Sequence, residues 1–159
     1  RVGLLSPCSK KWGERILLKE SDILYFSFIH NNAYFIRRKF IDDIRERYEP
    51  SYMNFLFDGT NFRGYGSESE IIAKGYINDW ATALTTKTMC FENENYLKEK
   101  FKEIKTDNYE RNIELYIKEG KKWARNKYGF NSRWQFLFYT KSLYNRFFEY
   151  HSYLKKFEI

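Results

Sequence analysis

The most regular alternation of apolar and polar positions in the chain lies between residues 31 and 50. Ala33, Ile36, Phe40, Ile44 and Tyr48 recur at spacings of three or four, which places them on one face of an α-helix. A single apolar stripe of this kind is typical of a helix that must be covered by another element. We therefore expect the rest of the chain to pack around this segment.

The boundaries and the polar face of the segment support the same assignment. Asn31 or Asn32 can cap its start, and Pro50 prevents its continuation. Oppositely charged residues lie four positions apart on the outer face, where such pairs stabilise a helix by a few tenths of a kcal/mol each. These pairs are Arg38 with Asp42, Lys39 with Asp43, and Asp43 with Arg47.

Three later segments also carry the helical period. Residues 67–84 open with a capping box made by Ser67 and Glu70, and residues 107–128 open with an Asp-x-x-Glu box and are followed by Gly129. Residues 132–154 can be capped by Asn131 or Ser132. This last segment is aromatic on nearly every side, which is typical of a helix at the centre of a core or of a docking surface.

The N-terminal part is less regular. Residues 2–5 are apolar and are followed by Ser6 and Pro7, a pattern that fits a strand or an extended arm, and we expect the arm. Residues 23–29 are continuously apolar, which fits a strand or a helix, and the continuation of the helical stripe favours the helix.

Together these assignments predict a mainly α fold. We expect an extended N-terminal arm over residues 1–20 and a single helical domain over residues 21–159. The domain is predicted to be a bundle of four to five amphipathic, aromatic-rich helices, with a small β element near residues 52–57.

Charge and cysteine content narrow the function classes. The net charge of +7 favours anionic partners such as RNA or another polyanion. Cys8 and Cys90 form neither a disulfide framework nor a zinc motif, so we predict no metal and no cofactor, and an intracellular, reducing compartment fits best. The chain has no apolar run of about 18 residues, hence no predicted membrane span.

A basic cluster gathers towards the end of the 107–128 segment, next to aromatic residues. Such a cluster can bind a phosphate backbone while a neighbouring ring stacks on a base. The alternative is an ordinary solvated helix face, with cations favoured near the helix C-terminus. The cluster comprises Lys118, Lys121, Lys122, Arg125 and Lys127, and the neighbouring rings are those of Trp123, Tyr128 and Trp134.

The last helix supplies the candidate partner-binding residues. Trp134, Phe138, Phe147 and Phe148 belong to a helix whose aromatic side chains point in too many directions to face one interior. Together with the small size and basic character of the chain, this predicts a non-enzymatic accessory subunit that docks through aromatic helix faces in a larger protein or ribonucleoprotein assembly.

The same helix contains the alternative function. Arg146 and His151 form an Arg-x4-His motif, which resembles the catalytic motif of HEPN-type ribonucleases. That resemblance implies an all-helical dimer that cleaves RNA without metal, with the imidazole moving a proton and the guanidinium binding the phosphate.

Three patches between Ile23 and Trp80 are similar to the LYR family of small mitochondrial helical-bundle proteins. They are Ile23-Leu24-Tyr25, residues 43–48, and residues 71–75 leading to Trp80. This resemblance implies a basic accessory subunit or assembly factor of a mitochondrial complex.

Overall fold

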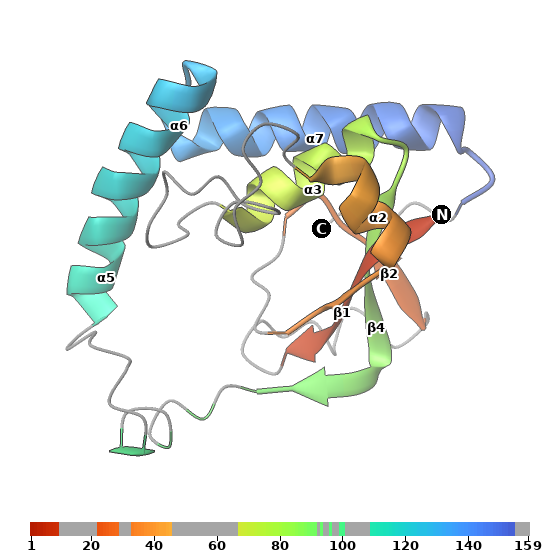
Figure 1. The fold of residues 1–159 in the computed structure, drawn as a ribbon, viewed down its shortest axis with the longest axis horizontal. Coiled ribbons are helices and arrows are strands. Elements are labelled where there is room, and N and C mark those ends of the chain that lie inside the picture. Colours follow the sequence, from red (N-terminus) through yellow and green to blue (C-terminus); the bar gives the residue numbers. More distant parts are fainter. Residues whose placement is uncertain are drawn as a thin grey trace.

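The computed structural model describes residues 1–9, 22–28, 33–45, 67–91, 93, 96, 99–100 and 109–154. Within them the chain forms an α/β fold with a mixed sheet of four strands, so the expected mainly α helical bundle is wrong. The strands are β1 (Val2–Ser9), β2 (Ile23–Tyr25), β3 (Phe35–Ile36) and β4 (Ala81–Cys90). The helices are α2 (Arg38–Ile44), α3 (Ser67–Ile77), α5 (Tyr109–Leu115), the π-helical turn η3 (Tyr116–Gly120), α6 (Lys121–Tyr128) and α7 (Arg133–Tyr150) (Figure 1).

The sheet has the order β2-β4-β1-β3. β1 and β4 are parallel, whereas β2 pairs antiparallel with β4 and β3 pairs antiparallel with β1. Residues 2–9, which we expected to belong to an N-terminal arm, therefore form an inner strand with neighbours on both sides. Leu4 and Cys8 of this strand are fully buried, as is typical of strands covered on both faces.

Pro7 explains why this strand was missed. A proline in an inner strand cannot donate a ladder hydrogen bond and usually marks an irregularity. The register of β1 against β4 shifts at this point, because Pro7 pairs with Thr85 whereas Cys8 pairs with Met89. The strand therefore continues past the proline through an irregular step in the ladder.

The segment with the most regular helical stripe is helical only in part. Phe35 and Ile36 form β3 and pair with Leu5 and Leu4 of β1, so the helix begins at Arg38 instead of near residue 31. Its polar face is as predicted where it is described, with ion pairs from Arg38 to Asp42 (3.4 Å) and from Lys39 to Asp43 (3.5 Å). The predicted partner of Asp43, Arg47, lies outside the described residues.

Two further segments expected to be helical contain strands. α3 ends at Ile77, and a turn at Asn78 and Asp79 follows, where Asp79 has a left-handed φ of 60°. The chain then enters β4, which is rich in β-branched threonine and pairs with β1 and β2. Residues 23–25, for which we favoured a helix, form β2. The β element expected near residues 52–57 lies outside the described residues.

The core is centred on Phe40, whose exposed fraction is 0%. Its ring packs against two glycines, such that a Cβ placed on Gly3 would lie 2.1 Å from Cδ2, and one placed on Gly75 would lie 2.9 Å from Cε2. Trp80 contacts the ring edge-on, with 6.0 Å between centroids. The indole N–H of Trp80 donates to Asp43 Oδ2 (2.9 Å), and this hydrogen bond is the main cause of the lowered pKa of Asp43.

The C-terminal helices are largely as predicted. The 107–128 segment is helical from Tyr109 to Tyr128 and ends at Gly129, whose φ of 73° confirms its predicted role at the helix end. Ser132 caps α7 in a capping box with Gln135. α7 packs against α3, whereas the α5–α6 helix stands apart from the sheet (Figure 1).

Truncation of Phe40 should strongly lower the free energy of unfolding, and a substitution at Gly3 tests whether this glycine is required by the Phe40 ring. We expect Phe40→Ala to lower the free energy of unfolding by about 3–5 kcal/mol. Gly3→Ala should cost about 1–3 kcal/mol in the wild type because the new methyl group meets the ring. In the Phe40→Ala background the same change should cost much less, since the ring is gone.

Denaturant unfolding of the wild type, the two single variants and the double variant measures this coupling. An equal cost of Gly3→Ala in both backgrounds would show that the glycine is not required by the Phe40 ring.

Candidate functional site

The α5–η3–α6 helix, referred to below as the rod, carries four exposed cations along one side. Lys118, Lys121, Lys122 and Arg125 are all exposed, and their spacings of three, four and seven keep them within about 100° of the helix circumference. They extend over roughly 10 Å, or two helical turns. We call these four residues the basic stripe.

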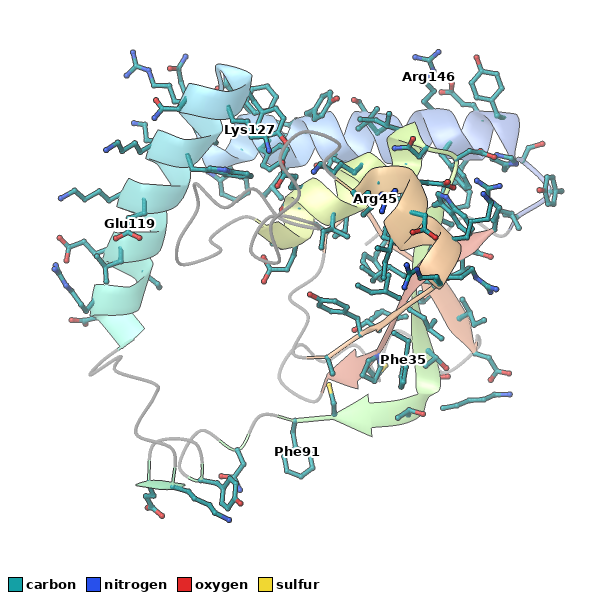
Figure 2. All side chains as sticks on the ribbon, viewed as in Figure 1. Phe35, Arg45, Phe91, Glu119, Lys127 and Arg146 are labelled. Atoms are coloured by element: carbon teal, nitrogen blue, oxygen red, sulfur yellow. The ribbon has the colours of Figure 1, made fainter. Side chains whose placement is uncertain are left out.

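Lys127, the fifth predicted member of the basic cluster, points the other way. Its Nζ lies 2.6 Å from Oε1 of Glu70 on α3, and the side chain of Glu70 is only 1% exposed. The Tyr128 hydroxyl donates to the same carboxylate oxygen, and Lys74 Nζ lies 3.9 Å from it. In Figure 2, Lys127 lies where α6 meets α7. The Glu70 carboxylate thus attaches the rod to the body of the protein.

A cluster of aromatic rings completes this attachment. Trp123 of α6 packs edge-on against Phe136 of α7, with 5.7 Å between centroids, and Tyr128 stacks on the same Phe136 ring at 5.1 Å. Phe130 in the connecting turn packs against both Tyr128 and Phe136. Trp123 and Tyr128, which we expected beside the phosphate site as stacking rings, therefore hold α6 on α7.

The surface formed by α6, the turn and the part of α7 before Glu149 contains no acidic side chain of its own. Between Glu119 and Glu149 the sequence has no Asp or Glu but seven Lys or Arg residues: Lys121, Lys122, Arg125, Lys127, Arg133, Lys141 and Arg146. Of these, Lys127 is paired with Glu70. The other cations of α6 keep their charge at the surface, which creates a positive potential on this side of the molecule.

The outer face of α7 carries two of the four predicted partner-binding residues. Trp134 is 57% exposed and Phe138 is 69% exposed, and Lys141 follows on the same face. Phe147 and Phe148, in contrast, are buried in the core, where Phe147 contacts Tyr76 of α3 and Phe148 contacts Tyr25 of β2. These two phenylalanines cannot meet a partner while the core is intact.

Arg146 and His151 do not form a joint site. Arg146 projects away from the sheet in Figure 2, and its guanidinium lies 5.9 Å from the centroid of the Tyr150 ring. His151 follows α7 and turns towards the α3–β4 turn, with Nε2 2.5 Å from Asp79 Oδ1 and Nδ1 3.3 Å from the Tyr153 hydroxyl. The α/β fold also differs from the all-helical fold that the resemblance to HEPN-type ribonucleases implies.

The described residues contain no group of three or more His, Cys, Asp or Glu side chains that could hold a metal ion. Cys8 is buried and Cys90 is partly buried, and the described residues contain no disulfide between them. In the same part of the chain, no helix has the length and apolar character needed to cross a bilayer.

Comparisons with known families, with curated proteins and with solved structures found no match to this chain. The patches that resemble the LYR family lie partly in β2 and α3 of a mixed α/β fold, which is not the helical bundle that this resemblance implies. The assignment of the candidate site therefore rests on the positions and contacts of its residues described above.

The role of Glu70 was not anticipated from the sequence. We expected its carboxylate to complete a capping box with Ser67. The contacts of the carboxylate are made by Oε1, which meets Lys127, Tyr128 and Lys74. A signal was present, because Lys127 lies on the side of the rod opposite Lys118 and Lys122 by helical spacing. Its partner is 57 residues earlier in the chain, which local pattern analysis cannot identify.

A comparison of two lysines on the same helix tests the attachment of the rod. We expect Lys127→Met to lower the free energy of unfolding by about 1.5–3 kcal/mol, because it removes a hydrogen bond to a buried carboxylate. Lys122→Met removes the same charge from an exposed position and should change it by less than about 0.5 kcal/mol. Denaturant unfolding of both variants provides the measurement, and equal effects would show that the contact with Glu70 does not attach the rod.

Proposed function

We propose that this protein is a small, basic, non-enzymatic accessory subunit that binds nucleic acid within a larger ribonucleoprotein assembly. The basic stripe of the rod is the element that contacts the phosphate backbone. The observation that carries the proposal is the placement of Lys118, Lys121, Lys122 and Arg125 on one exposed side of a helix that stands apart from the sheet.

The pattern of charges on the rod supports binding over a merely solvated face. Cations at i,i+3 and i,i+4 repel one another, at a cost of a few tenths of a kcal/mol per pair in an isolated helix. The stripe contains four such pairs: Lys118 with Lys121, Lys118 with Lys122, Lys121 with Arg125, and Lys122 with Arg125. A bound polyanion relieves this repulsion and releases its own condensed counterions.

The helix α2 provides the contrasting case within the same chain. Its exposed cations at Arg38 and Lys39 are each paired with an aspartate four residues later. Such pairs of opposite charge stabilise a solvent-exposed helix face without any bound partner. On the rod, Glu114 and Glu119 lie four and three positions before Lys118 and Lys122, but no acidic residue lies three or four positions from Lys121 or Arg125. Much of the charge of the stripe is therefore available to an anionic partner.

If the basic stripe binds phosphates, the affinity for nucleic acid should depend on salt concentration in a specific way. We expect the triple variant Lys121→Gln, Lys122→Gln and Arg125→Gln to weaken binding to nucleic acids of every sequence. The slope of log K against log salt should fall by roughly 2, since each lost contact to a single strand contributes about 0.7. Fluorescence anisotropy with labelled oligonucleotides at several salt concentrations measures both effects.

The control removes three exposed cations elsewhere, at Arg38, Lys87 and Lys100. The substitutions Arg38→Gln, Lys87→Gln and Lys100→Gln lower the net charge by the same amount and should change the slope much less. Equal losses in the two triple variants would show that net charge alone drives binding and that the stripe is not the site.

A further inference from the structure

We infer that the bound nucleic acid is single-stranded and that its bases stack on the exposed rings of Trp134 and Phe138 on α7. This inference rests on the proposed function above, because the basic stripe supplies the contacts to the phosphates. It adds the class of nucleic acid and the element that recognises it.

The two rings lie in a position suited to stacking. Trp134 and Phe138 are four residues apart on the outer face of α7 and are 57% and 69% exposed. The Cβ atoms of residues at this spacing lie about 5–6 Å apart, so two successive bases of one strand can each meet one ring. Lys141 is exposed on the same face and extends the pattern of rings and cations.

The rings and the basic stripe are held together by a short, defined connection. α6 ends at Gly129 in a left-handed conformation, and Ser132 caps α7 three residues later. Trp134 lies within roughly 24 Å of Arg125 along the chain, counting four helical residues and five extended ones. The contact between Trp123 and Phe136 fixes α6 on α7, so the rings and the basic stripe keep a fixed separation, which a bound single strand has to span.

The positive charge of this surface favours a polyanionic ligand, and the exposed rings favour a ligand with unpaired bases. No Asp or Glu occurs between Glu119 and Glu149, so a phosphate chain passing from the basic stripe to the rings meets no acidic residue of this segment. In a duplex the base faces are stacked on one another and present only their edges. A single strand exposes those faces to aromatic side chains, and stacking on them tolerates any base sequence.

The experiment uses the full chain with two labelled probes of equal phosphate number, a single-stranded oligothymidine and a hairpin duplex. Trp134→Leu combined with Phe138→Leu should weaken binding of the single strand by at least about tenfold. The affinity for the duplex and the salt slope of both probes should be unchanged, since no cation is removed. The intrinsic tryptophan fluorescence of the wild type should be quenched by the single strand, and the Trp134→Leu variant should lose most of this quenching.

A matched control and a check on folding accompany these variants. Phe35 and Phe91 are also exposed, at 68% and 79%. Phe35 lies in β3 and Phe91 directly follows β4, and both lie away from the rod (Figure 2). Phe35→Leu combined with Phe91→Leu should leave binding of both probes unchanged. Because all four rings are at the surface, circular dichroism and the unfolding midpoint should be close to those of the wild type.

The outcomes separate the two claims. If the ring variant binds the single strand as tightly as the wild type while the basic-stripe variant does not, the phosphate contacts stand and the stacking inference is overturned. In that case another occupant, such as a protein subunit, covers this face of α7. If the wild-type protein binds neither probe at low salt, the proposed function itself fails, and the inference fails with it.

Discussion

The packing of the Phe40 ring between two glycines is the contact on which the rest of the structure depends. Gly3 lies in β1 and Gly75 lies in α3, and a side chain on either one would collide with the ring. α2 is thereby held against an inner strand and a helix at once. Because tightly packed cores tolerate little change in volume, this contact fixes where α3 runs relative to the sheet.

The position of α3 in turn sets the position of the candidate site. Glu70 lies in the first turn of α3, and its buried carboxylate binds Lys127 and Tyr128 of α6. The aromatic contacts between α6 and α7, together with the packing of α3 on α7, complete the connection. The basic stripe is therefore carried on a helix whose inner side is bound to the body and whose outer side faces solvent.

Local signals in the sequence predicted the C-terminal half well and the N-terminal half poorly. The end of α6 and the start of α7 could be predicted because Gly129 and Ser132 form their capping contacts with residues less than two helical turns away in the chain. The strands depend on partners far apart in sequence, such as Leu4 with Ile36, so a helical stripe that included Ile36 was misleading. The sequence placed all five cations on the polar side of the helix, and Lys118, Lys121, Lys122 and Arg125 are exposed there. The inward turn of Lys127 depends on a tertiary partner, Glu70.

The most direct test of the account is to map the surface that a single-stranded oligonucleotide covers. Amide hydrogen exchange, followed by mass spectrometry with and without a saturating oligothymidine, reports protection along the whole chain. We expect added protection in peptides from the basic stripe and the first two turns of α7, and little change in β1, β4 and α2. Protection centred on His151 and Asp79, with none on the rod, would contradict the account.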